Sequence, residues 1–264
     1  MAKTNRYSQI IEAIFFKSFK KGKREIAFTR DEIISTAKKL KIALPKNLGD
    51  VIYSFRYRAQ LPQTILNEAS DGFEWIIRSA GTSQYYLALA KQALFKPNEL
   101  LTLTKIPDAT PGIISKYAMN DEQALLAKVR YNKLIDIFTG LTCYSLQNHL
   151  RTTVPKIGQV ETDEIYIGID KRGVHYFIPV QAKGGNDKLG LVQLEQDFAI
   201  GASKFPNLIC KPIATQFMNN GAIALFEFEQ SNNEISIASE KHYQLVNPDE
   251  ISHTELENYK LRNF

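Results

Sequence analysis

The sequence is poor in the residues that build disulfide scaffolds and zinc sites. It contains 2 cysteines and 4 histidines in 264 residues. Cys143 and Cys210 lie far apart, outside any CxxC motif, and neither has zinc-ligand spacing to a histidine. These absences argue against a disulfide-rich secreted domain and against a zinc module. They favour a protein of the reducing cytoplasm.

Long hydrophobic runs are also missing. No apolar stretch approaches the roughly 20 residues that a membrane-spanning helix needs, and no signal-peptide core follows the opening MAKTNRYSQ. We therefore expect no membrane partner. The composition, 44% hydrophobic and 23% charged, is that of a globular protein, and the length can bury one large core or two smaller ones.

Charge is distributed unevenly along the chain. Residues 1–95 contain 16 Lys and Arg against 8 Asp and Glu, whereas the remaining residues contain 17 against 20. A basic first third suggests contact with a polyanion such as DNA. A solvated basic face would explain the charge alone equally well, so the interpretation depends on the motifs that follow.

The first third has the pattern of a small helical domain with a hairpin. Thr29 can cap a helix with Glu32 as its capping-box partner three residues later. Helical spacing of apolar residues and two strand-like runs complete the pattern. The expected helices and strands cover 7–19, 29–40, 46–58, 73–78 and 84–89.

Three helices followed by a hairpin is the order of a winged helix-turn-helix domain, which we assign to residues 1–95. In such a domain the third helix enters the major groove of double-stranded DNA. The candidate DNA-binding residues are Asn47, Ser54, Arg56 and Arg58. Because the two arginines do not share a helix face, at most one can read a base while the other meets phosphate. The alternative is a helical subdomain with merely solvated arginines.

Residues 96–264 have an α/β pattern, which predicts a mixed sheet flanked by helices. After a connector over 98–115, the expected order is a long helix, a short helix, an acidic hairpin, a helix and three strands. The three helices are expected at 121–138, 141–152 and 187–202, the hairpin at 159–183, and the strands near 207–217, 222–229 and 233–246.

The acidic hairpin is the most informative stretch. Its first strand opens with Glu161, Asp163 and Glu164, and its return strand ends on Gln181 and Lys183. Carboxylates beside a polar-x-Lys sequence can hold Mg²⁺ and place an ammonium group where a water and a phosphate meet. Acids are common at strand ends, however, and Lys183 would then be an ordinary surface lysine.

The pairing register decides which of these side chains meet. If Ile169 pairs with Val174, Gln181 and Lys183 share a face with Glu164, and Asp163 points to the other face. A bulge or bend after Asp163 would then be needed to bring it to Lys183.

These residues resemble the PD-(D/E)xK nuclease superfamily, which has the restriction-endonuclease-like fold. The sequence GQVETD is similar to the family's form around its metal-binding Asp, and Gln181 stands where the second acid is usual. The resemblance implies that Asp163, Gln181 and Lys183 are catalytic. It implies that Asp163 and Glu164 bind the metal, with Glu161 as an outer acid.

The resemblance further implies a Mg²⁺-dependent endonuclease that cuts double-stranded DNA. A type II restriction enzyme is the first reading, and a double-strand cut by paired sites implies a homodimer. The neutral Gln181 keeps a second reading open, a sequence-specific DNA-binding regulator with a degenerate nuclease domain. A repair, junction-resolving or transposition nuclease is the third.

Overall fold

The structure, a computed structural model, describes residues 7–57, 59–117, 121–184, 187–232 and 234–262. The chain forms two compact units. The first comprises Met1–Phe95, Arg151–Glu161 and Lys188–Ser203, and the second comprises the rest. The division after Phe95 falls where the sequence places its domain boundary. The structure differs from the predicted division by adding two later segments to the first unit.

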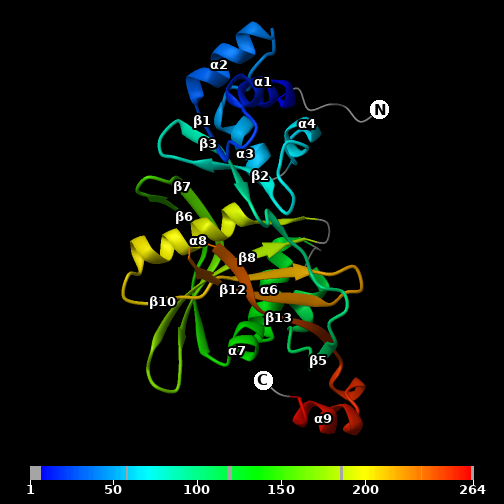
Figure 1. Ribbon diagram of the computed structural model, residues 1–264. Helices are drawn as coiled ribbons and strands as arrows, with labels where there is room; N and C mark the ends of the chain where they lie inside the picture. The colour runs from blue at the N-terminus through cyan, green and yellow to red at the C-terminus, as the bar shows by residue number, and fades with distance from the viewer. Residues whose placement is uncertain (1–6, 58, 118–120, 185–186, 233, 263–264) are drawn as a thin grey trace. The chain divides into compact units, whose positions relative to one another are not determined.

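The first unit begins with helices around a small antiparallel sheet (Figure 1). Its sheet has the order β1-β3-β2, and the capping box of Thr29 and Glu32 starts α2 as predicted. Strand β1 was not expected. The elements are α1 (Ser8–Ser18), β1 (Glu25–Thr29), α2 (Arg30–Lys39), α3 (Gly49–Tyr57), α4 (Gln63–Leu66), β2 (Glu74–Ser79) and β3 (Gln84–Ala90).

Aromatic and aliphatic side chains fill the core of this unit. Phe15 of α1 meets Trp75 of β2 edge to face, with ring centroids 5.1 Å apart. Val51 and Ile52 of α3 are buried in the same cluster. This packing explains why the third helix forms, since its apolar face covers the sheet while its polar residues stay outside.

A segment from late in the sequence completes the first unit. Strand β4 (Leu94–Phe95) pairs with β9 (Leu189–Gly190), and α8 (Leu191–Lys204) follows at once. The guanidinium Nε of Arg78 in β2 donates to Glu195 Oε1 of α8 at 2.9 Å. These contacts attach α8 to the N-terminal elements, although the sequence groups it with the nuclease-like part.

A large mixed sheet has the strand order β5-β13-β12-β11-β8-β7-β6, with β10 beside β8. Pairs β8–β11 and β5–β13 are parallel, whereas β7–β8, β11–β12 and β12–β13 are antiparallel. The strands are β5 (Leu103–Pro107), β6 (Thr142–Val154), β7 (Gly158–Ile169), β8 (His175–Lys183), β10 (Ile209–Cys210), β11 (Ile213–Phe217), β12 (Ile223–Ser231) and β13 (Glu234–Val246).

Helices accompany this sheet in the second unit (Figure 1). The buried side of α6 brings Leu125 and Val129 into one cluster with Ile178 and Val180 of β8. The mixed α/β class with a helix-flanked sheet is thus confirmed. The helices are α5 (Gly112–Tyr117), α6 (Glu122–Tyr131), α7 (Leu134–Thr139) and α9 (His253–Lys260), with a 3-10 turn at Pro248–Glu250.

Three expectations for this part were wrong. Residues 142–154 form strand β6 and no helix, because pairing with β7 outweighs a weak helical pattern. The long helix over 121–138 breaks into α6 and α7 at Lys133, whose φ is 52°. The connector contains strand β5, which pairs with β13 far along the chain. Local sequence carries no signal for such a pairing.

No helix in the described ranges is both long and apolar enough to cross a lipid bilayer.

Candidate functional site

The register of the β7–β8 hairpin differs from the predicted one by a single residue. Ile169 pairs with His175 and Glu164 pairs with Val180. The turn is one residue longer than expected because Asp170 closes it: its N–H donates to the Val174 carbonyl at 3.1 Å, and its Oδ1 accepts from the Val174 N–H at 2.9 Å. The predicted pairing of Ile169 with Val174 was therefore wrong.

This shift exchanges the two faces of β7. By alternation, Asp163 now shares a face with Gln181 and Lys183, and Glu164 lies on the opposite face with Val180. The sequence-based arrangement, with Glu164 beside Lys183, was wrong. The bulge invoked to bring Asp163 to the lysine is unnecessary, because the register alone does so.

The Asp163 carboxylate lies directly against the polar-x-Lys segment. Its Oδ2 accepts a hydrogen bond from the backbone N–H of Ala182 at 2.8 Å. The regular pairing of the two strands ends at Glu164 and Val180. Past this pair, the Asp163 carboxylate takes the place of a backbone carbonyl as the acceptor for the Ala182 N–H. Asp163 is half-buried and Gln181 is 2% exposed. The structure thus brings together three predicted residues, Asp163, Gln181 and Lys183.

A fourth residue, which the sequence did not indicate, joins this group. Lys183 is 8% exposed, and its Nζ lies 3.3 Å from Oε1 of Glu122 in the first turn of α6. Only the position of Glu122 behind the N-cap Asp121 distinguished it in the sequence, and a helix-start acid is common.

Other acids act on Glu122, the partner of Lys183. Burial raises the pKa of Glu122, the nearby Lys183 ammonium opposes that rise, and the Asp163 and Asp187 carboxylates add to it. Across the sheet, Lys183 pairs with Gln216 of β11, whose Nε2 donates to the Asp187 carbonyl at 3.3 Å. The site is therefore a partly buried cation bordered by carboxylates and amides.

Glu164, the predicted second metal ligand, is not part of this group. Its side chain is 0% exposed, and Oε1 accepts from Ser145 Oγ at 2.8 Å and from Arg130 Nε at 2.9 Å. Glu161, the predicted outer acid, pairs with Arg151 at 2.9 Å. Both acids are held by arginines rather than directed to Lys183.

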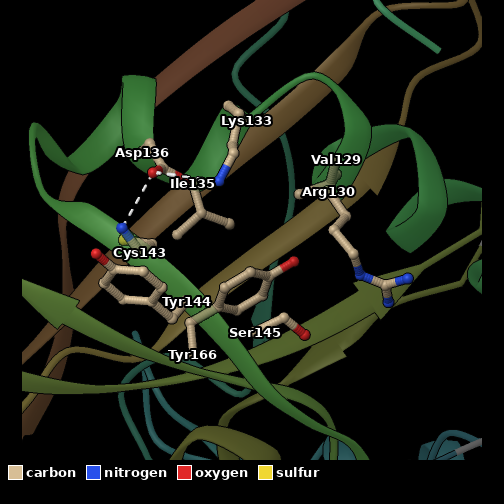
Figure 2. Close-up of a pocket in the computed structure, with 9 residues that line it drawn as sticks. All are labelled: Val129, Arg130, Lys133, Ile135, Asp136, Cys143, Tyr144, Ser145 and Tyr166. Atoms are coloured by element: carbon tan, nitrogen blue, oxygen red, sulfur yellow. Dashed lines mark hydrogen bonds and ion pairs between the residues drawn. The ribbon is translucent and has the colours of Figure 1, made fainter.

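A pocket of about 260 Å³ lies on the Glu164 side of the sheet. Figure 2 shows the Tyr166 ring across it, with the hydroxyl directed toward Arg130. Burial raises the pKa of Tyr166, so the phenol stays neutral. None of the predicted catalytic residues lines the pocket, whose walls are Val129, Arg130, Lys133, Ile135, Asp136, Cys143, Tyr144, Ser145 and Tyr166.

The predicted DNA-binding residues of α3 have different surroundings. The exposed Asn47 is engaged at the helix start, where Oδ1 accepts from Gly49 N and Nδ2 donates to Asp50. Ser54 is half-buried. The Arg56 guanidinium lies 5.0 Å from the Tyr57 ring centroid, and Arg58 lies outside the described residues.

Among the described residues, no three His, Cys, Asp or Glu side chains come close enough together to hold a metal ion. Comparisons with protein families, with curated proteins and with solved structures returned no match for this chain. The functional interpretation therefore depends on the geometry of the site.

Proposed function

We propose that this chain is a Mg²⁺-dependent endonuclease that hydrolyses phosphodiester bonds in double-stranded DNA, as a type II restriction enzyme does. The observation that carries the proposal is the position of the Asp163 carboxylate on the Ala182 N–H, on the face that holds Gln181 and Lys183. An acid and a lysine on adjacent antiparallel strands are the pairing that the nuclease resemblance implies.

The fold supports the same proposal. The order α6, β6, β7, β8, α8, β11 places the acidic hairpin between helices, in a mixed sheet where β11 runs parallel to β8. In the first unit, the order α1-β1-α2-α3-α4-β2-β3 with a β1-β3-β2 sheet supports the proposal of a winged helix, with α4 as an added short helix. A winged helix would bring the chain to duplex DNA, with α3 toward the major groove.

The donor set fits a magnesium ion held mainly by substrate. Mg²⁺ sites in phosphate-transferring enzymes use one or two carboxylates, with phosphate and water oxygens completing the shell. Asp163 would supply one carboxylate, and Glu122, now paired with Lys183, would supply the other. The amide of Gln181 adds an oxygen without charge. When bound, the ion would neutralise the phosphate and acidify a water.

The chain's own residues then have separate roles. Asp163 and Glu122 would hold the ion, and their carboxylates lie on the side from which the scissile phosphate would approach Lys183. Lys183, with its ammonium nearly buried, stabilises the negative charge that develops on the phosphate and orients the attacking water. Cutting both strands needs two such sites, which we propose a homodimer supplies on DNA.

A second candidate function is a DNA-binding regulator with an inactive nuclease domain. The observation that favours it is Gln181, which is neutral and buried where the resemblance places an acid. Incubating supercoiled plasmid with the protein, with Mg²⁺ or with EDTA, separates the two. Discrete Mg²⁺-dependent fragments support a restriction enzyme. Nicked or smeared products indicate a structure-selective nuclease, and uncut but retarded plasmid indicates the regulator.

A further inference from the structure

Neighbouring residues of β7 point in opposite directions and contact different elements. Asp163 meets the N–H of Ala182 in β8, whereas Glu164 is buried on the other face and meets Arg130 of α6. The same helix carries Glu122, the partner of Lys183, in its first turn. The Arg130–Glu164 contact thus joins helix α6 to strand β7 next to Asp163.

The contact between Arg130 and Glu164 is directional. Arg130 donates to Glu164 Oε1 from Nε at 2.9 Å and approaches it with Nη2 at 2.8 Å. Its Nη2 also donates to Asn148 at 3.2 Å, and Ser145 Oγ donates to the same carboxylate oxygen at 2.8 Å. A planar guanidinium with several partners fixes both position and angle, and a lysine cannot reproduce this.

At the C-cap of α6, Asn132 accepts a hydrogen bond from Ala109 N and donates one to Thr110 Oγ1. Between the first turn and Arg130, the contacts of α6 are largely non-directional. Its buried residues, Leu125, Leu126 and Val129 among them, pack against apolar side chains of the sheet. Such packing holds the helix against the sheet, but it changes little in energy when the helix slides or rotates by a small amount. Glu122 and Arg130 stand about two turns apart on one rigid helix, so the guanidinium sets where the first turn lies.

We propose that the Arg130–Glu164 pair positions Glu122 relative to Asp163 and Lys183. Glu164 is a positioning residue, and its buried carboxylate acts through the helix rather than on metal or substrate. The inference rests on the proposed nuclease function, which makes the spacing of these groups matter. It also gives a separate role to each of the two consecutive acids of β7, which face opposite sides of the sheet.

The test is a double-mutant cycle on the full-length protein with plasmid cleavage as readout. Arg130→Met should reduce the cleavage rate by roughly 10- to 100-fold, because small misplacements of catalytic groups have effects of that size. In a Glu122→Gln background, the same Arg130→Met change should reduce the rate by less than about twofold, since the carboxylate that Arg130 positions is already removed. Arg172→Met, at a surface ion pair of the same hairpin, should leave both rates unchanged.

Stability is separated from positioning by an apolar pair. Arg130→Met combined with Glu164→Leu should recover the unfolding temperature, because a buried ion pair can often be replaced by apolar groups of similar volume. Cleavage should stay low in this variant. Recovery of both stability and cleavage, or equal losses from Arg130→Met in the two backgrounds, would overturn the proposal. If Arg130→Met does not fold, Arg130→Lys takes its place in the cycle.

A metal-binding measurement, which does not depend on cleavage, distinguishes failure of the positioning inference from failure of the proposed nuclease function. If the wild-type protein leaves DNA uncut, the nuclease proposal fails, and Mn²⁺ binding followed by electron paramagnetic resonance takes the place of cleavage. Arg130→Met should then weaken Mn²⁺ binding in the wild-type background and leave it unchanged in the Glu122→Gln background. Equal effects in the two backgrounds, or no Mn²⁺ binding by the wild type, would overturn the positioning role.

Discussion

The ammonium of Lys183 lies 3.3 Å from the carboxylate of Glu122, which joins the end of β8 to the first turn of α6 across 61 residues. On the same face of the hairpin, Asp163 accepts the N–H of Ala182. An acid from a helix therefore meets the lysine of β8, and an acid from β7 meets the backbone of the residue before that lysine. This convergence makes the hairpin a candidate site rather than a solvated strand end.

Removing either predicted catalytic group should abolish cleavage while DNA binding persists. Asp163→Ala removes the carboxylate at Ala182, and Lys183→Ala removes the nearly buried ammonium. Each change should lower the cleavage rate by roughly 10²-fold or more, measured at saturating Mg²⁺. Lys171→Ala, in the turn at the other end of the hairpin, is the matched control. Normal cutting by either site variant would remove the site assignment.

Substitutions of Glu122 and Glu161, two acids outside the predicted metal-binding pair, should change the Mg²⁺ dependence of cleavage differently. Glu122→Gln removes a carboxylate beside Lys183, so the Mg²⁺ concentration for half-maximal cleavage should rise by roughly tenfold. Glu161→Gln disturbs a partly exposed pair with Arg151, and its Mg²⁺ profile should match the wild type. A larger shift for Glu161→Gln than for Glu122→Gln would reverse the assignment of the second acid.

A substitution at Gln181 should raise the apparent Mg²⁺ affinity and not lower it. Gln181→Glu adds a carboxylate on the face of Asp163, at a position that is 2% exposed. The apparent Mg²⁺ affinity should rise, whereas the unfolding temperature without metal should fall because the new buried acid and the half-buried Asp163 repel each other. Thermal unfolding with and without Mg²⁺ measures both effects. An unfolding temperature that Mg²⁺ does not restore would show that residue 181 lies away from the metal.

DNA binding should depend on salt and on α3. We expect log affinity to fall linearly with log salt concentration, and Arg56→Ala to reduce the slope by about one if its guanidinium meets a phosphate. The complete chain is the right sample, because residues 1–95 alone lack Glu195, the ion-pair partner of Arg78. Lys260→Ala in α9 is the control. An unchanged slope for Arg56→Ala would place the DNA contact elsewhere.

The two cysteines should differ in reactivity. Burial raises the pKa of Cys143 to about 11, whereas Cys210 is partly exposed. At pH 8 a thiol reagent should modify Cys210 and spare Cys143 in the folded protein. Because the folded state holds the Cys143 proton more tightly than the unfolded state, stability should decline as pH rises from about 9 toward 11. Cys143→Ser, monitored by thermal unfolding across this range, should remove that decline.

Local sequence was sufficient for much of this molecule. The capping box at Thr29 starts α2, and Asp170 and Gly173 form the turn between β7 and β8. Apolar periodicity also predicted α1, α3 and α8. These features depend on side chains a few residues apart, so their physics is contained in short stretches of chain.

Tertiary structure alone decided the rest. One extra residue in the turn exchanged the faces of β7, placing Asp163 at the candidate site and Glu164 under Arg130. Glu122 reaches Lys183 only because α6 packs on the sheet. The pairing of β5 with β13 and the attachment of α8 through Arg78 likewise require partners far along the chain. The residue types of a strand indicate which chemistry a site can perform. Because a strand's side chains alternate between two faces, only the pairing register determines which of them meet.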